Sequence, residues 1–374
     1  MTAVRTPHLH GEGSVPASGT VFDEFADWVL SNRFATATQI HVQVADHRPV
    51  DLASGHSLGA EPCRIDDLIP TYCMSKPLLP IMVGHLLDSG MSLDDTVDAA
   101  AAALGMDVKP RTTIGEVLVH RAGLAHPRAA VWRMYPESQR HVLLATVAPV
   151  PTNAYSEIAG GLLIEALIEE RFGVPAAEWL TTKVLEPLGV ESSFVVDPAG
   201  VAAVRHRVRP SVGGLPARPL PLLSELLPGQ LAEIRPAFSA LAEARGVGRI
   251  LAGMFSVQSG HTVAGLPSPA SVAEMALDSG RYDDEVLGRP TRFVGGFLTD
   301  LNDHIGPTPL HLSSFGVLGG MNNALGVVDP SRELVAVLVT NGVIVDDASM
   351  FETRRRFVEA SCRWADDLCG GSTC

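Results

Sequence analysis

Residues 68–77 read LIPTYCMSKP, and this stretch decides the fold. Cys73 and Lys76 are three residues apart, so on a helix their side chains share one face, one turn apart. Pro77 suits the first turn of that helix, where no backbone donor is lost. A thiol at a helix N-terminus beside an ammonium ionises readily, so the spacing favours a reactive thiolate. The alternative is a buried structural cysteine beside a surface lysine, because this spacing also occurs by chance.

The composition indicates a globular protein of 374 residues with 46% apolar and 19% charged residues. Its formal net charge of −14 argues against a nucleic-acid partner, since phosphate contacts need a basic surface. Residues 1–18 lack the apolar core of a secretory signal, and the apolar runs are too short to span a bilayer. We therefore expect a cytoplasmic protein with no membrane partner. Five cysteines, an odd number, predict thiols rather than a disulfide framework.

The hydrophobic pattern predicts helices and strands in a particular order along the chain. Helices are expected near the two ends, and strands next to them in the sequence: helices over 22–30 and 351–368, a hairpin over 40–53, and strands over 292–298, 316–328 and 334–340. The middle is helical over about 99–188, most clearly at 158–172, and again over 237–254 and 271–277. The proline-rich stretch 198–236 predicts a long irregular loop, and such loops are usually lids or binding loops.

This order predicts an α+β fold, because one sheet built from both chain ends needs few long crossings. The expected sheet is mainly antiparallel and flanked by the N- and C-terminal helices. Residues 1–95 and 285–374 would form the sheet domain. Residues 96–284 would form an inserted all-helical domain that carries the loop at 198–236.

A series of motifs resembles the penicillin-binding protein and serine β-lactamase superfamily, in the branch of class C β-lactamases, esterases and transacylases. Residues 68–76, followed by GHLLDSGMSLDDTV at 84–97, are similar to its Ser-x-x-Lys helix and the loop after it. The later motifs follow in the family's order: TIGEVLVHRAGL at 113–124, YSE at 155–157, EPLG at 186–189, FGVLGG at 315–320 and the segment from DP at 329–330 to TNG at 340–342. The resemblance covers nearly the whole chain and implies a β-lactamase/transpeptidase-like fold.

The resemblance also implies roles for single residues. Cys73 would be the nucleophile, Lys76 its proton acceptor or electrostatic activator, and Tyr155 the second acid or base. Which of Lys76 and Tyr155 is the base stays open. The backbone N–H groups of Cys73 and Gly320 would form the oxyanion hole. The chain has only three lysines and four tyrosines, so it is improbable that chance alone places one of each at positions 76 and 155.

Three positions depart from the family pattern. Cys73 replaces the serine, and Glu157 replaces the usual asparagine of the second motif. Glu157 could pair with Lys76, receive a substrate ammonium, or be an ordinary helix-start acid. Val317 replaces the usual histidine or lysine, which argues against β-lactams and other carboxylate-bearing substrates. His311 could substitute if strand alternation put it on the same face as Val317; the alternative is a satisfied or exposed histidine.

The remaining site expectations are modest. Leu318 and Gly319, with Val317, would line the substrate site, and His120 would stabilise its own loop. The other cysteines are expected to be structural or to lie in the C-terminal tail without the spacing of a zinc site: Cys63, Cys362, Cys369 and Cys374. We therefore expect neither metal nor cofactor.

The function predicted from these residues is acyl transfer through a Cys73 thioester, with specialised metabolism as the expected setting. The partners would be a small-molecule acyl donor and an amine or alcohol acceptor. Amines compete with water for a thioester more successfully than they do for an oxygen ester. Three alternatives stay open: an esterase- or amidase-type hydrolase, a non-catalytic binding protein on the same scaffold, and a true β-lactamase or peptidoglycan enzyme.

Overall fold

The computed structural model describes residues 19–56, 61–124, 154–156, 158–213, 236, 240–319, 322–343 and 347–370. Its largest element is an eight-stranded sheet in the order β2-β1-β12-β11-β10-β9-β8-β7, and every pair of neighbours in it is antiparallel. The strands are β1 Ala37–Val44, β2 Val50–Gly55, β7 Tyr282–Asp284, β8 Arg289–Val294, β9 Phe297–Thr299, β10 Phe315–Gly319, β11 Ala324–Asp329 and β12 Leu334–Thr340.

Both ends of the chain build this sheet, as predicted. β1 lies between β2 and β12, with Ile40 opposite Leu338. The seven residues of β12 are all buried, because the helices over residues 244–258 and 347–368 pack against it. A strand buried on both faces reads as a continuous apolar run rather than an alternating one. The α+β fold with a mainly antiparallel sheet is confirmed.

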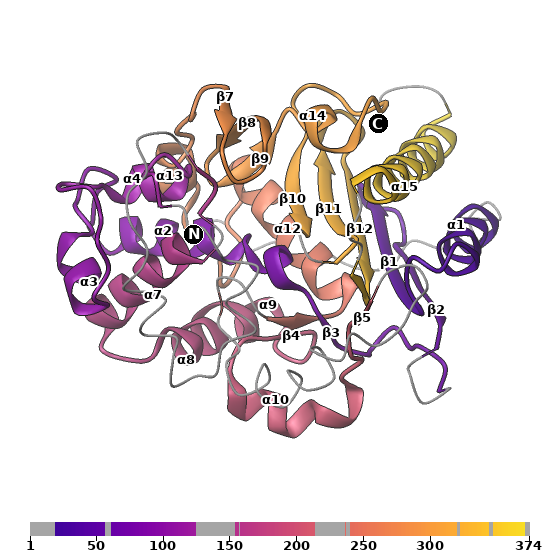
Figure 1. Cartoon of the computed structure of the whole chain (residues 1–374), viewed down its shortest axis with the longest axis horizontal. Coiled ribbons are helices and arrows are strands. Elements are labelled where there is room, and N and C mark those ends of the chain that lie inside the picture. The colour runs from indigo at the N-terminus through magenta and orange to yellow at the C-terminus, as the bar shows by residue number, and fades with distance from the viewer. Residues whose placement is uncertain are drawn as a thin grey trace, which may run out of the picture.

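Three helices cover the sheet. α1 Gly19–Ser31 and α15 Asp347–Leu368 lie side by side and contact each other (Figure 1). Their contact is aromatic, with the Phe25 and Phe357 ring centroids 5.5 Å apart. α12 Ala244–Gln258 packs against β1, β11 and β12. A side chain at Gly248 of α12 would collide with His41 of β1, so close approach of helix and sheet requires glycine there.

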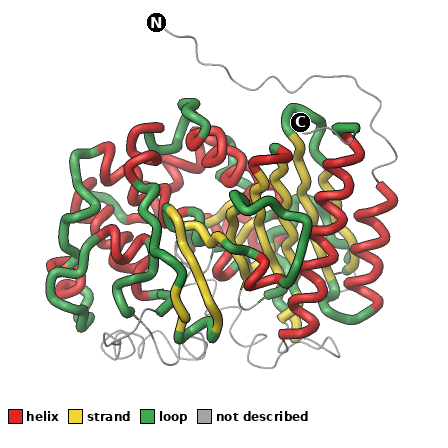
Figure 2. The backbone as a smooth tube through the Cα atoms, turned by 90° about the horizontal axis from the view of Figure 1, so that it is seen from above, coloured by secondary structure: helices red, strands yellow, loops and turns green. Residues whose placement is uncertain are grey.

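Most of the other helices gather on the opposite side of the molecule (Figures 1 and 2). They are α2 Leu78–Asp88, α3 Asp98–Ala103, α4 Ile114–Leu118, α7 Ala159–Phe172, α8 Ala176–Leu180, η2 Thr181–Leu185, α9 Glu186–Leu188 and α13 Pro269–Glu274. α4 begins with a capping box between Thr113 and Glu116, and α7 ends at Gly173 in the left-handed conformation. α12 packs on the sheet, whereas the sequence assigned it to the helical insertion; the division into two domains stays a prediction.

Several boundaries differ from the sequence prediction. The single strand expected at 292–298 is two strands, β8 and β9, because Gly295 and Gly296 have positive φ and form a tight turn. The strand expected at 316–328 is likewise the hairpin of β10 and β11. Part of the expected irregular loop is regular: α10 Pro198–Val204, η3 Arg205–Arg207 and β5 Val212–Gly213. Most of residues 214–239 lies outside the described residues.

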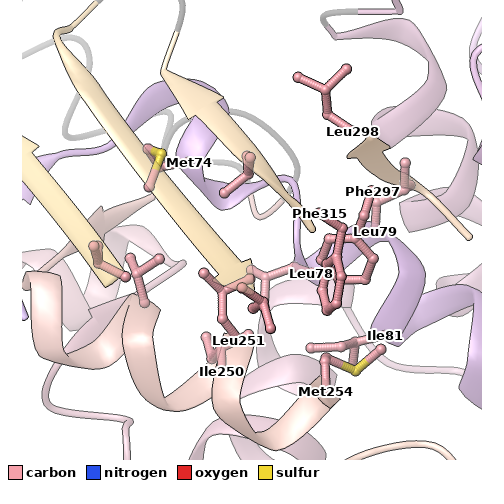
Figure 3. Close-up of a cluster of buried hydrophobic side chains, with 14 of the residues drawn as sticks. Met74, Leu78, Leu79, Ile81, Ile250, Leu251, Met254, Phe297, Leu298 and Phe315 are labelled. Carbon is pink, nitrogen blue, oxygen red and sulfur yellow. The ribbon is translucent and has the colours of Figure 1, made fainter. Parts of the chain in front are cut away.

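Short strands hold the segment that leads to Cys73. β3 Ile69–Pro70 pairs with β6 Leu241–Ala242, which also pairs with β4 Phe194–Val195, and β5 pairs with β13 Gly342–Val343. β6 occupies part of the region where a helix was expected, so α12 begins only at Ala244. Beyond β3, Met74, Leu78 and Leu79 enter the same buried cluster as Leu251 of α12 (Figure 3). The candidate catalytic segment is therefore fixed to the core on both sides of Cys73.

No described helix has the length and apolar character needed to cross a membrane. Cys63, Cys73 and Cys362 are free thiols and buried, but Cys369 is disulfide-bonded. The expectation that all five cysteines are thiols is therefore wrong for Cys369.

We predict that Asn341→Ala destabilises the fold. The buried Asn341 side chain accepts hydrogen bonds from the backbone N–H groups of Thr36 and Ala37, at 3.1 and 2.9 Å, and donates to the Pro210 carbonyl at 3.2 Å. Losing it leaves these groups unsatisfied in the interior, which should lower the free energy of unfolding by about 2–4 kcal/mol. Urea unfolding measures this. Asn32→Ala, at an exposed position, is the control, and equal losses in the two variants would contradict the prediction.

Candidate active site

A cavity of about 370 Å³ lies where the segment carrying Cys73 meets β10. Its described lining brings together residues that are far apart in the sequence: Cys73, Lys76, Pro77, His120, Tyr155, Val286, Leu287, Arg289, Phe293, Gly296, Phe297, Leu298, His304, Gly316, Val317, Leu318, Met350 and Arg354. A pocket of this size, mostly apolar with a few convergent polar groups, is typical of a small-molecule site. The three residues predicted to carry the chemistry, Cys73, Lys76 and Tyr155, all line it.

Cys73 lies in a short 3-10 turn, η1 Tyr72–Ser75, rather than in the first turn of an α-helix. Tyr72, the residue before it, has φ = 49°, a conformation that is costly for a bulky side chain. The surroundings hold this strained turn: the Tyr72 hydroxyl lies 3.1 Å from that of Ser211, and Ser75 Oγ donates to the Tyr72 carbonyl at 2.8 Å. Strain of this kind is concentrated at functional sites, where it aims a side chain.

Lys76 and Tyr155 meet in the cavity beside Cys73. The Lys76 Nζ is 5.7 Å from the centre of the Tyr155 ring, and the Lys76 side chain is buried. Tyr155 is held by rings on two sides, with His120 at 4.7 Å and Phe293 at 6.0 Å between ring centroids. A thiol, an amine and a phenol from segments about 80 residues apart thus line one cavity.

His120 is buried and contacts the segment that carries Tyr155. Its Nδ1 accepts a hydrogen bond from the Ser156 backbone N–H at 3.1 Å, which places its ring proton on Nε2. Burial, and then the positive charge of Lys76, lower the pKa of His120 to about 3. His120 thereby fixes the position of the segment that carries Tyr155.

The other predicted site residues are placed unevenly. Val317 and Leu318 of β10 line the cavity, and Gly319 follows them at the end of the strand. His311 does not reach the site: it precedes β10, is exposed, and its Nδ1 lies 2.8 Å from Ser313 Oγ in a turn. Strand alternation cannot relate it to Val317, since β10 begins only at Phe315. Glu157 and Gly320 lie outside the described residues.

The sequence prediction missed three basic residues of the cavity, Arg289, His304 and Arg354. One signal was present for Arg354, which shares a helical stripe with the buried Phe357, Val358 and Ser361, unlike its neighbours Arg355 and Arg356. Arginine supplies most of the basic residues of this chain, so a single arginine in the sequence does not by itself indicate a site.

Nothing in the described part of the chain resembles a metal site, because no three His, Cys, Asp or Glu side chains gather there. The other two buried free thiols of the described chain, Cys63 and Cys362, lie in surroundings that disfavour the thiolate. Burial is the main cause that raises the pKa of Cys63 and of Cys362 to about 12. Neither lines the cavity.

Residues 40–359 match the Beta-lactamase family model. This is most of the chain, so the protein belongs to the Beta-lactamase family. Comparison with curated proteins finds no match.

Solved structures of the same fold resemble this chain closely in shape. A penicillin-binding protein homolog from Caulobacter crescentus is 20% identical with a TM-score of 0.71, covering 94% of this chain and 99% of that one. A family VIII carboxylesterase is also 20% identical, with a TM-score of 0.72 and coverages of 94% and 99%. Simvastatin synthase from Aspergillus terreus is 16% identical, with a TM-score of 0.70 and coverages of 92% and 98%. At these identities the likeness establishes the β-lactamase/transpeptidase-like fold.

We predict a pH-dependent effect of His120→Asn. Above pH 6.5 neither folded nor unfolded His120 holds the extra proton; below it the unfolded form does, while the folded imidazole stays neutral down to about pH 3. As the pH is lowered below 6.5, protonation of His120 in the unfolded chain should therefore decrease the free energy of unfolding by about 1.4 kcal/mol per pH unit. Asn fits the left-handed backbone, φ = 56°, and its amide oxygen can replace Nδ1 as acceptor.

Urea unfolding of both proteins at pH 7, 6 and 5 measures the difference. All other titrating groups are shared and cancel in the comparison. The variant should lose less stability than the wild type between pH 6 and 5. Parallel pH profiles would show that His120 is not held neutral.

Proposed function

We propose that this protein is an acyltransferase that forms a thioester on Cys73 and passes the acyl group to an amine or alcohol. The observation that supports this most is the cavity that Cys73 shares with Lys76 and Tyr155. A nucleophile, a second group able to accept its proton and a third acid or base are the parts that covalent acyl transfer needs. The family membership and the esterase, amidase and acyltransferase names among the structural neighbours agree with this chemistry.

The proposed reaction has two halves. In the first, Cys73 Sγ attacks the carbonyl carbon of the donor, its proton passes to whichever of Lys76 and Tyr155 is in its unprotonated form, and the leaving group departs with a proton; a protonated Lys76 would act as electrostatic activator. In the second, an acceptor amine or alcohol attacks the thioester carbonyl and loses its proton, and Cys73 leaves as the thiolate. No oxidant, metal or cofactor enters this balance. The oxyanion of each half would be held by the backbone N–H groups of Cys73 and, outside the described residues, Gly320.

Transfer rather than hydrolysis is proposed because of the sulfur. A positioned thiol is a stronger nucleophile than a hydroxyl, and the thioester it forms prefers amines to water more than an ester does. The apolar walls of the cavity, among them Phe293, Phe297 and Leu298, would further disfavour water. Glu157 keeps its predicted role as a possible partner for an acceptor ammonium.

We predict that incubation with small acyl esters or thioesters adds one acyl mass to the protein, on Cys73. Intact-mass measurement and peptide mapping detect the adduct, and added amine should discharge it to amide faster than water discharges it to acid. Lys76→Met and Tyr155→Phe should each slow adduct formation by about 10²-fold or more, because each removes a group that moves protons.

Cys73→Ala is the matched control and should carry no adduct. Cys63→Ala removes a buried thiol outside the cavity and should leave the adduct unchanged. Discharge mainly to acid would indicate the hydrolase instead, and turnover of a chromogenic β-lactam would indicate a β-lactamase. Absence of any Cys73-dependent adduct across donors, with ordinary alkylation kinetics of Cys73, would overturn the proposal in favour of a binding protein.

A further inference from the structure

Another cavity, of about 550 Å³, is formed by described residues and has no part in the proposed acyl transfer. We call it the second cavity, and we call the one lined by Cys73 the catalytic cavity. The apolar side chains around the second cavity come from α12, from α13 and the residues just after it, and from β8 to β10: Met254, Val257, Val272, Ala273, Met275, Ala276, Val294, Phe297 and Phe315. Arg292 also lines it, but its guanidinium donates to both carboxylate oxygens of Asp278, at 3.0 and 2.6 Å. The second cavity therefore suits an apolar group.

The two cavities lie on opposite faces of the hairpin of β8 and β9. Phe293 and Leu298 line the catalytic cavity. Val294 and Thr299, their neighbours along the strands, line the second cavity instead, as expected because successive side chains of a strand point to opposite faces. Among the described residues, Phe297 is the one that lines both cavities. The hairpin is thus the wall between them, and Phe297 is the point where they come closest.

Phe297 is a firmly packed part of this wall. Its side chain is buried, and its ring meets the edge of the Phe315 ring with 5.2 Å between centroids (Figure 3). It is the first residue with a side chain after the turn at Gly295 and Gly296. The turn has no room to shift, because a Cβ atom at Gly296 would lie 2.8 Å from Leu118 Cδ1. Removing the Phe297 ring would therefore join the two cavities.

This wall lies close to the reacting groups. Phe293 stacks with Tyr155, with 6.0 Å between ring centroids. Leu298 lies opposite Phe293 on β8 and opposite a residue of β10, and β10 also contacts the turn η1 that carries Cys73. An acyl group on Cys73 would therefore have apolar side chains of the hairpin beside it, and burial of apolar surface would favour an alkyl chain that runs along them.

We propose that Phe297 sets the length of the acyl group that Cys73 accepts, by closing the catalytic cavity against the second one. The substrate class is an apolar acyl group short enough to end at the Phe297 ring. A longer chain has to displace a ring that packs against Phe315, or leave its end in water, and both reduce the free energy gained by burial. This proposal rests on the proposed function, because it concerns the acyl group that Cys73 would carry.

Acylation of Cys73 by N-acetylcysteamine thioesters of butyric, hexanoic, octanoic and decanoic acid tests this limit. Intact mass gives the rate for each donor, and the ratio of the decanoyl rate to the butyryl rate cancels any general loss of activity. Phe297→Ala should raise this ratio by about 10-fold or more, since room for even one further methylene is worth that much. Phe297→Leu should raise it less, and it carries the same test where Phe297→Ala does not fold. Phe172→Ala removes a half-exposed ring outside both cavities and should keep the wild-type ratio.

Filling the second cavity shows where the longer chain goes. Ala273 of α13 is exposed and lines only the second cavity, so Ala273→Trp should occupy that space without disturbing the core. Added to Phe297→Ala, it should return the ratio toward the wild-type value, whereas alone it should leave the ratio unchanged. A ratio that neither Phe297 variant raises, or that Ala273→Trp alone lowers, would overturn this proposal only. A missing Cys73 adduct with every donor would overturn the acyl-transfer proposal as well.

Discussion

The strained turn at Tyr72 is the constraint on which the site depends, and the chain holds it by fixing the residues just before it. Pro70 ends a strand that pairs with β6, and its carbonyl accepts a hydrogen bond from Asn322 Nδ2 at 3.2 Å. The Thr71 side chain and backbone both donate to the Ala240 carbonyl. With both sides anchored, the turn cannot relax by shifting along the chain, so the side chain of Cys73 is kept toward the cavity.

The burial of Lys76 has consequences for its neighbours. An ammonium in a buried site is costly, and its cost falls when nearby titrating groups stay neutral or anionic. His120 meets this requirement by accepting, rather than donating, at Nδ1. The Lys76 Nζ also lies over the face of the Tyr155 ring, 5.7 Å from its centre, where the ring attracts a cation. The positive charge of Lys76 is therefore not opposed by a charged His120.

The sequence predicted the sheet from both chain ends and the trio of Cys73, Lys76 and Tyr155, since both are encoded locally. Alternating or continuous apolar runs specify strands, and short motifs specify the trio. The three basic residues Arg289, His304 and Arg354 were not predictable in this way, because β8, α14 Asn302–Ile305 and α15 each contribute one of them and only folding brings them together. Of the two alternatives for His311, the structure supports the exposed histidine, because a turn separates it from the strand that carries Val317. The apolar run over 292–298 predicts one strand, whereas in the structure the chain turns at Gly295 and Gly296, whose positive φ the run does not reveal.

Two departures from the family pattern, Cys73 and Val317, line the same cavity. At Val317 a side chain without charge lies on β10, whereas Arg354 reaches the end of the same strand through the Gly319 carbonyl. With Val317 in place of a strand cation, β10 presents an apolar side chain to the cavity, and the positive charge of Arg354 comes from α15 instead. An apolar surface disfavours water at a thioester. Under the acyl-transfer proposal, Cys73 and Val317 would therefore favour the same outcome, in which the acyl group on sulfur reacts with an acceptor other than water.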